Sequence, residues 1–165
     1  MQNAYLGIGY VYELESEWGK ALSYTLQALH YAEQSANPSD KASVYNYMGA
    51  EYLGLNNDKL AEEFLRKAAI LFKRVNNLDQ LGDNEISLAN LFAARGNYDS
   101  AEHHFSNAIS LFTNLDEPYQ IADVYQQMGD MYLKRKMYKG HCPRETTRRH
   151  TLPAHTASAA VRHRR

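Results

Sequence analysis

The side chains that could do chemistry lie in short clusters without the spacing of a catalytic or metal site. Glu102-His103-His104 is the richest cluster, but adjacent histidines on a helix point about 100° apart, so they cannot chelate one metal ion together. They fall between residues expected to pack, and we predict that they are solvated or half-exposed. His141-Cys142 offers one thiol without a preorganised base, which disfavours nucleophilic catalysis.

Two further patterns are better explained by structure than by chemistry. Gly7-Ile8-Gly9 lies inside a helical pattern rather than after a strand, and no Gly-x-x-x-x-Gly-Lys-Ser/Thr loop for phosphate occurs. Carboxylates are frequent, as in Glu13-x-Glu15-x-Glu17, where a spacing of two alternates around a helix. We expect a solvated acidic face there, with no visible reason for a shifted pKa. The sequence therefore predicts no enzyme activity, no metal site and no cofactor.

The elements that position these side chains recur with a 40-residue period. Such a period is the signature of a repeat architecture. Each column below holds one kind of side chain at this spacing, and five columns at one spacing are hard to produce by chance. The columns are Ala21/Ala61/Ala101, Ala28/Ala68/Ala108, Gly9/Gly49/Ala89/Gly129, Tyr12/Tyr52/Phe92/Tyr132 and Ile8/Met48/Leu88/Met128.

Each repeat is predicted to contain two helices. Met48-Gly49-x-x-Tyr52 places a small residue and an aromatic residue on one face of a first helix, so that a neighbouring helix approaches closely. Ala61-x-x-x-Leu65-x-x-Ala68 repeats this pattern on a second helix. Asn, Asp, Ser and Pro between these segments offer helix N-caps and first-turn residues. No β-strand pattern is present.

These columns resemble the tetratricopeptide repeat (TPR) family, in particular its branch with longer helices. The matching residues are a Gly or Ala followed three positions later by Tyr or Phe, the turn Gly96-Asn97-Tyr98, and the two alanines of the second helix. The resemblance implies an all-α, right-handed superhelical solenoid of antiparallel helix pairs over residues 1–139. We expect repeats at about 2–38, 39–77 and 78–117, and the first helix of a fourth at 118–136. Thr25 departs from the pattern, because Leu65 and Phe105 occupy its column.

In this family the first helices line a concave groove that binds peptides. Carrying the pattern over to this sequence implies a groove of polar and tyrosine side chains, which suit the backbone of an extended peptide. The implied groove residues are Tyr10, Asn46, Tyr47, Asp83, Ser87, Asn90, Asp123, Gln126, Gln127 and Asp130. The acidic residues among them favour a neutral or basic peptide as partner. A chaperone C-terminus is disfavoured, because Asp83 and Ser87 stand where that variant of the family has basic residues.

The net charge of −1 is the sum of two unlike parts. Residues 1–139 hold 12 Lys or Arg and 18 Asp or Glu, a net charge of −6, and they contain all 13 tyrosines. Residues 140–165 hold six Arg and one Glu, a net charge of +5, and break the 40-residue register. We predict that this tail is disordered. It is either an accidental end, such as a frameshift or read-through, which we favour, or an arm that binds nucleic acid or an acidic surface.

Within the fourth repeat, the first helix is expected to lack a partner of its own repeat. We therefore expect Met128, Met131, Tyr132 and Leu133 to be partly exposed, and we consider self-association through this end. No apolar run approaches 18 residues, so no membrane span is expected, and we predict a cytoplasmic protein. The predicted function is a peptide-binding scaffold or sensor. The alternative is a TPR piece of a larger signalling enzyme or transcription factor, although the body charge of −6 makes nucleic acid an unlikely partner.

Overall fold

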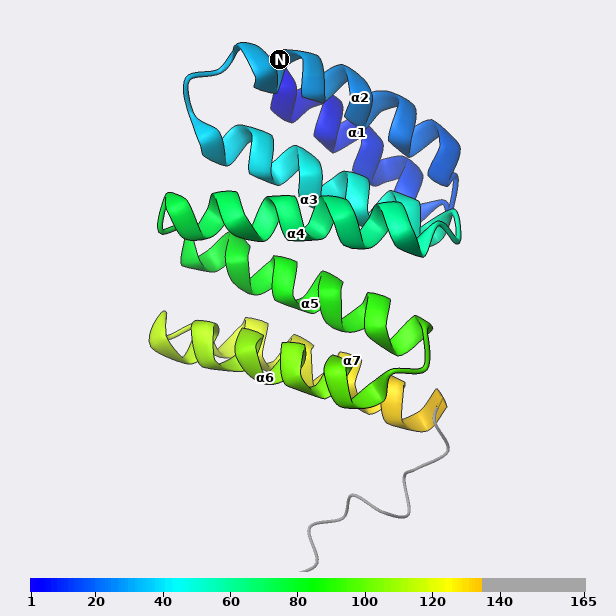
Figure 1. Ribbon diagram of the computed structural model, residues 1–165, viewed down its shortest axis with the longest axis vertical. Helices are drawn as coiled ribbons and strands as arrows, with labels where there is room; N and C mark the ends of the chain where they lie inside the picture. Colours follow the sequence, from blue (N-terminus) through cyan, green and yellow to red (C-terminus); the bar gives the residue numbers. More distant parts are fainter. Residues whose placement is uncertain (135–165) are drawn as a thin grey trace, which may run out of the picture.

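The computed structural model describes residues 1–134, and these residues form a stack of helices without a strand. The predicted tail, 140–165, and the end of the predicted fourth repeat lie outside the described residues. The helices are α1 (Gln2–Leu14), α2 (Trp18–Gln34), α3 (Pro38–Gly54), α4 (Asp58–Arg74), α5 (Leu78–Ala94), α6 (Tyr98–Asn114) and α7 (Pro118–Lys134) (Figure 1). The predicted all-α solenoid is thus confirmed for this part of the chain.

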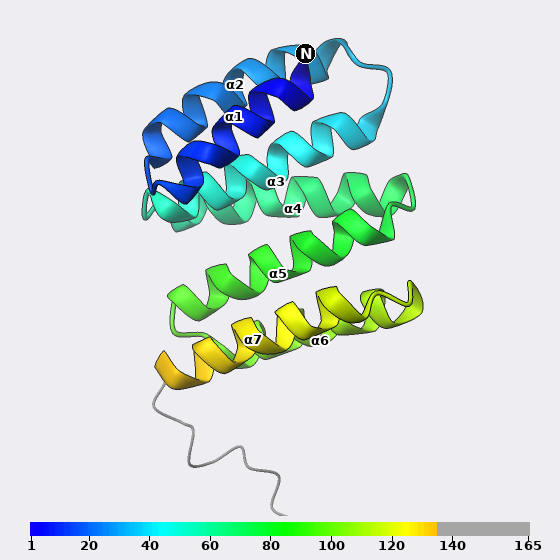
Figure 2. The same cartoon turned by 180° about the vertical axis from the view of Figure 1, so that it is seen from behind.

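The helix lengths account for the 40-residue period. Each of α2 to α7 has 17 residues, and three residues separate each helix from the next, so a new helix starts at every twentieth position. Two such units make one repeat. Figure 1 shows α2, α4 and α6 on the near side of the stack, and Figure 2 shows α1, α3, α5 and α7 on the other side. The first helices of the repeats therefore share one face of the solenoid.

Five of the six connections between α1 and α7 reverse the chain through one left-handed residue at their centre. In the connection from α3 to α4, Asn56 has φ = 57°, and its N–H donates to the carbonyl of Leu53 while the N–H of Asn57 donates to Tyr52. This pair of bonds satisfies carbonyls that the helix end leaves unpaired. The equivalent residues are Ser16, Asn76, Gly96 and Asp116. The exception is the connection from α2 to α3.

The residue after the left-handed position also starts the next helix. Asn57 accepts a hydrogen bond from the backbone N–H of Leu60 at 3.3 Å. Asn77 and Asn97 cap α5 and α6 in the same way, and Asn37, in the connection without a left-handed residue, caps α3 by accepting from the N–H of Ser39. The predicted use of Asn as N-cap is confirmed. An asparagine side chain in this position satisfies a donor that the first turn leaves free, typically stabilising the helix by about 1 kcal/mol.

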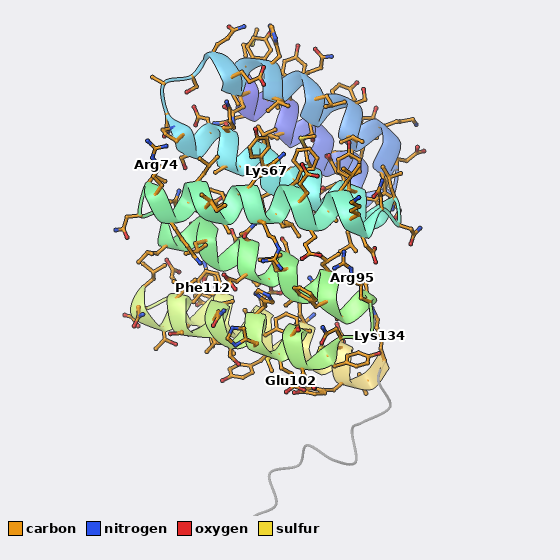
Figure 3. All side chains as sticks on the ribbon, in the orientation of Figure 1. Lys67, Arg74, Arg95, Glu102, Phe112 and Lys134 are labelled. Atoms are coloured by element: carbon orange, nitrogen blue, oxygen red, sulfur yellow. The ribbon has the colours of Figure 1, made fainter. Side chains whose placement is uncertain are left out.

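The repeating columns form the core between the helices. All six alanines of the two predicted alanine columns are fully buried. A Cβ added to Gly49 would lie 2.5 Å from the side chain of Leu65, and one added to Gly82 would meet the ring of Phe112, which lies between α5 and α6 (Figure 3). Small residues are therefore required where these helices approach closely.

Within each repeat, one aromatic ring of the first helix stacks on a ring of the second. Tyr12 stacks on Tyr24, Tyr52 on Phe64, and Phe92 on His104, with ring centroids 5.4, 5.5 and 5.2 Å apart. Both members of each pair keep the 40-residue spacing. His104 thus takes the place of an aromatic residue in the third repeat.

The exposure predicted for α7, the first helix of the fourth repeat, is only partly confirmed. Leu133 is 59% exposed, as expected, but Met131 is 4% exposed, so the prediction of its exposure is wrong. Met131 packs with Phe105 of α6, because its position on the helix faces the preceding repeat. The opposite face is open: beyond its own stretch of helix backbone, no atom of the described residues lies within 4 Å of a Cβ placed on Gly129. Within residues 1–134, no helix is both long and apolar enough to cross a membrane.

Candidate functional site

Two adjoining hollows lie along the face formed by the first helices. The larger has a volume of about 610 Å³ and the smaller about 350 Å³, and both are bordered by Leu53 and Asn90. The larger is otherwise lined by Ala93, Ala94, Tyr98, Gln127, Asp130, Met131 and Lys134. The smaller is otherwise lined by Glu13, Trp18, Ala50, Gly54 and Ser87. The hollows thus form one groove that crosses α1, α3, α5 and α7 near their C-terminal ends.

Three of the predicted groove residues form a chain of hydrogen bonds from α5 to α7. The amide nitrogen of Asn90 donates to Oε1 of Gln127 at 2.9 Å, and Nε2 of Gln127 donates to Oδ2 of Asp123 at 2.7 Å. The amides are therefore held in fixed orientations at the rim of the larger hollow. Asp130 also lines this hollow, whereas Gln126 is exposed on α7 and lines neither.

Asn46 is already engaged by a residue that the sequence-based prediction missed. The fully buried Asn84 donates its amide N–H groups to Oδ1 of Asn46, at 2.9 Å, and to the carbonyl of Leu65, at 3.1 Å. Asn84 thereby ties α5 to α3 and α4. The sequence held a signal for it, because Asn84 stands between Val44 and Val124 in one column of the 40-residue repeat.

The remaining predicted groove residues, Tyr10, Tyr47, Asp83 and Ser87, come from α1, α3 and α5, and only Ser87 lines a hollow. Ser87 donates to the backbone carbonyl of Asp83 at 3.1 Å. Burial, together with the neighbouring carboxylates Asp79 and Asp123, raises the pKa of Asp83 to about 6. Burial also raises the pKa of Tyr47, to which Glu13 and the half-exposed Tyr10 contribute.

Glu13 does not lie on a solvated face, so that prediction is wrong. Glu13 lines the smaller hollow, Oε1 of its carboxyl group is buried without a hydrogen-bond partner, and burial raises its pKa to about 7. Glu15 and Glu17 are exposed, as predicted. The difference arises because position 13 faces the groove, in the same column as Leu53 and Ala93.

A second buried carboxyl, Glu51, lies close to Glu13 and was also missed. Glu51 is fully buried, and its Oε1 accepts a hydrogen bond of 2.5 Å from the hydroxyl of Thr25. Burial raises its pKa to about 8, with a contribution from the charge of Glu13. The sequence shows no visible reason for a shifted pKa at Glu13, and burial supplies one at both Glu13 and Glu51. Thr25, which departs from its column, supplies the donor for this carboxyl.

Of the two adjacent histidines, His103 is exposed as predicted, but His104 is not solvated. Nδ1 of His104 lies 2.8 Å from Oε2 of Glu85, whose side chain is 7% exposed. Glu85 also accepts from Asn107 at 3.1 Å, and these contacts lower its pKa despite burial. His104 is held there because its position belongs to the stacked aromatic column. Among the described residues, no group of three His, Cys, Asp or Glu side chains could hold a metal ion.

Comparisons with known proteins bear on the fold. No protein-family model and no curated protein sequence matches the chain. Among solved structures, it is similar to the crystal structure of BtubC (BKLC) from P. vanneervenii, with 21% sequence identity and a TM-score of 0.64. The similarity covers 77% of this chain and 52% of that one, so this chain spans about half the length of BtubC. BtubC is a helical repeat protein, and the likeness supports the same type of fold for this chain.

Proposed function

We propose that this chain is a protein- or peptide-binding scaffold of the tetratricopeptide type, without catalysis of its own. In this proposal an extended segment of the partner lies in the groove across α1, α3, α5 and α7. The observation that carries the proposal is the pair of adjoining hollows that share Asn90. A groove with apolar floor residues and a few oriented polar groups is the usual form of a ligand site.

The oriented amides suit a peptide backbone better than a small apolar ligand. A primary amide has two donors and an acceptor, so it can bond both the N–H and the C=O of an extended segment. Asn90 uses one donor toward Gln127, which fixes its plane without occupying the whole amide. Such preorganisation lowers the entropic cost of binding.

The charges of the groove favour a neutral or basic partner. Glu13, Asp83, Asp123 and Asp130 supply carboxyl groups on this face, and the basic side chain among the lining residues is Lys134, which lines the larger hollow. An acidic segment would leave these carboxyls unpaired or repelled. Affinity should fall as salt is added, because exposed charges are screened over about 8 Å at physiological ionic strength.

A display selection tests this function. Random 12-residue peptides are selected on the immobilised full chain, and the affinities of recovered peptides are measured by fluorescence anisotropy for the wild type and for Asn90→Ala and Asp130→Ala. We expect each substitution to weaken binding about tenfold, while Ser106→Ala, on α6 of the other face, leaves it unchanged. A failure to recover any peptide, or equal binding by all four proteins, would contradict the proposed groove.

A further inference from the structure

We infer that the smaller hollow is a subsite for the side chain of a lysine or arginine in the bound peptide, with Glu13 as its counter-charge. This inference rests on the proposed peptide-binding function and specifies one contact of it. The hollow has a volume of about 350 Å³. At about 30 Å³ per water molecule, that is room for roughly ten waters and therefore for a long side chain.

The wall of the hollow has one charged group. Of the seven residues that line it, Glu13 carries a carboxyl, Ser87 and Asn90 are polar, and no basic side chain is among them. The rest of the wall is Trp18, Ala50, Leu53 and Gly54. This combination of apolar wall and single acid suits a side chain with an aliphatic stem and a cationic head.

The carboxyl of Glu13 lacks the partner that a buried acid normally has. Its Oε1 is buried and accepts no hydrogen bond within the described part of the chain, and burial raises its pKa to about 7. Buried polar atoms are nearly always hydrogen-bonded, because a lost partner leaves the group desolvated without compensation. A cationic head that enters the hollow would lie beside this carboxyl group and stabilise its carboxylate form.

A neighbouring aromatic side chain favours a cation over a neutral donor. Trp18 contributes an aromatic ring to the wall, and a cation over an indole face is favourable. The ring packs closely against Gly54 of α3, since a Cβ on this glycine would lie 2.2 Å from it.

The test uses two small cations in place of the unidentified peptide. N-acetyl-arginine methylamide and N-acetyl-lysine methylamide are titrated into the full chain at low salt, with the uncharged citrulline analogue as the matched neutral compound. Trp18 is the single tryptophan, so its indole N–H signal and its fluorescence report on this hollow alone. We expect saturable shifts of Trp18 with both cations, at concentrations at least about tenfold lower than with citrulline.

Two variants separate a specific subsite from general attraction to an acidic protein. Glu13→Gln keeps the shape of the side chain and should weaken binding of both cations about tenfold. Glu15→Gln removes the same charge from an exposed position two residues away and should leave binding unchanged. Absence of saturable shifts, equal binding of arginine and citrulline analogues, or equal effects of the two variants would overturn the subsite.

The same variants distinguish this subsite from the proposed function. If selected peptides depend on Asn90 but bind Glu13→Gln as tightly as wild type, the groove function stands and the cation subsite fails. If the small cations bind at Glu13 while no peptide is recovered by selection, the hollow accepts cations and the peptide-binding function fails.

Discussion

The first junction joins the first and second repeats through α2 and α3, and the second junction joins the second and third repeats through α4 and α5. The same two positions of the repeat hold polar side chains at the first junction and apolar side chains at the second. At the first, Thr25 of α2 bonds to Glu51 of α3; one repeat later, Leu65 of α4 packs with Leu91 of α5. All four side chains are fully buried. The same place in the solenoid therefore accepts either a hydrogen-bonded polar pair or an apolar pair.

The comparison shows that stability need not be uniform along the stack. In a solenoid each repeat contacts only its neighbours, so the strength of each junction is a local quantity. The Leu65–Leu91 pair stabilises its junction through buried apolar area, whereas the Thr25–Glu51 pair depends on the proton of Glu51, whose pKa is raised to about 8. One oxygen of Glu51 also lacks a hydrogen-bond partner. We therefore expect the first repeat to be held less firmly than the second and third.

The largest expected effect on stability comes from placing a glutamate at position 91, which corresponds in the second junction to Glu51 in the first. Leu91→Glu buries a carboxyl without a donor such as Thr25, which should lower the free energy of unfolding by about 3–5 kcal/mol. Urea unfolding followed by circular dichroism at pH 7.5 measures this change. Leu91→Met is the control, because Met131 occupies the same column, and it should cost less than about 1.5 kcal/mol. An equal loss of unfolding free energy in the two variants would show that the second junction tolerates a buried carboxyl as well as an apolar side chain.

The next effect is a dependence of stability on pH that arises at the first junction. The pKa of Glu51 is about 8 in the folded state and close to 4.5 when unfolded, so the folded state binds the extra proton between these values. Through Glu51 alone, the free energy of unfolding should fall as pH rises from about 4.5 to 8, by at most about 1.4 kcal/mol per pH unit. Glu13, up to about pH 7, and Asp83, up to about pH 6, add to this fall.

Urea unfolding at several values between pH 5 and 8.5 measures this slope. Glu51→Leu should reduce it strongly, while Glu15→Gln, at an exposed position, should leave it nearly as in wild type. A flat profile for the wild type, or an unchanged slope in Glu51→Leu, would show that the proton on Glu51 does not control this junction.

A smaller effect is expected when the donor alone is removed. Thr25→Val leaves both oxygens of Glu51 without a partner and should cost about 1–3 kcal/mol. Adding Glu51→Leu to this variant makes the first junction resemble the second and should recover most of the loss. A double-mutant cycle at pH 7.5 gives the coupling energy. Additive effects of the two substitutions would mean that the short hydrogen bond contributes nothing.

The smallest effect is expected from adding a methyl group to a glycine of the repeated column. Gly49 is covered by the next helix, whereas Gly129 lies on the open face of α7. Gly129→Ala should stabilise the protein by up to about 1 kcal/mol, because alanine favours the helix and no described atom lies near its Cβ. Gly49→Ala, in the same column, should destabilise it, since the Cβ would meet Leu65 at 2.5 Å. Thermal unfolding of both variants gives the signs. A destabilising Gly129→Ala would indicate that another segment or a second molecule covers this face.

The architecture followed from the sequence because it depends on repetition. The 40-residue columns predict two helices per repeat, and the asparagines at 37, 57, 77 and 97 recur once per helix as N-caps. Each such feature is local, so a helix start and a turn can be recognised without knowing the neighbours. The predicted burial of the alanine columns is confirmed for the same reason.

The polar interior was missed because it depends on pairs of residues from different helices. Glu51, Asn84 and His104 each interrupt an otherwise apolar or aromatic column, and this interruption was the available signal. The sequence does not reveal which residue of another helix bonds to each of these buried polar side chains. Thr25 meets Glu51, and Asn84 meets Asn46, only through the offset between adjacent helices. The same offset decides which groove residues border the hollows and which are already bonded to each other.

The equal spacing of the helix starts from α2 to α7 limits how such a chain can change in length. A gain or loss of one full repeat adds or removes a pair of helices and keeps every later helix on its own face. A change of half a repeat would also preserve caps and turns, yet it would carry each later helix to the opposite face. The groove side chains would then lie on the outside. Insertions and deletions that preserve the groove must therefore add or remove helices in pairs, although the local geometry repeats with every single helix.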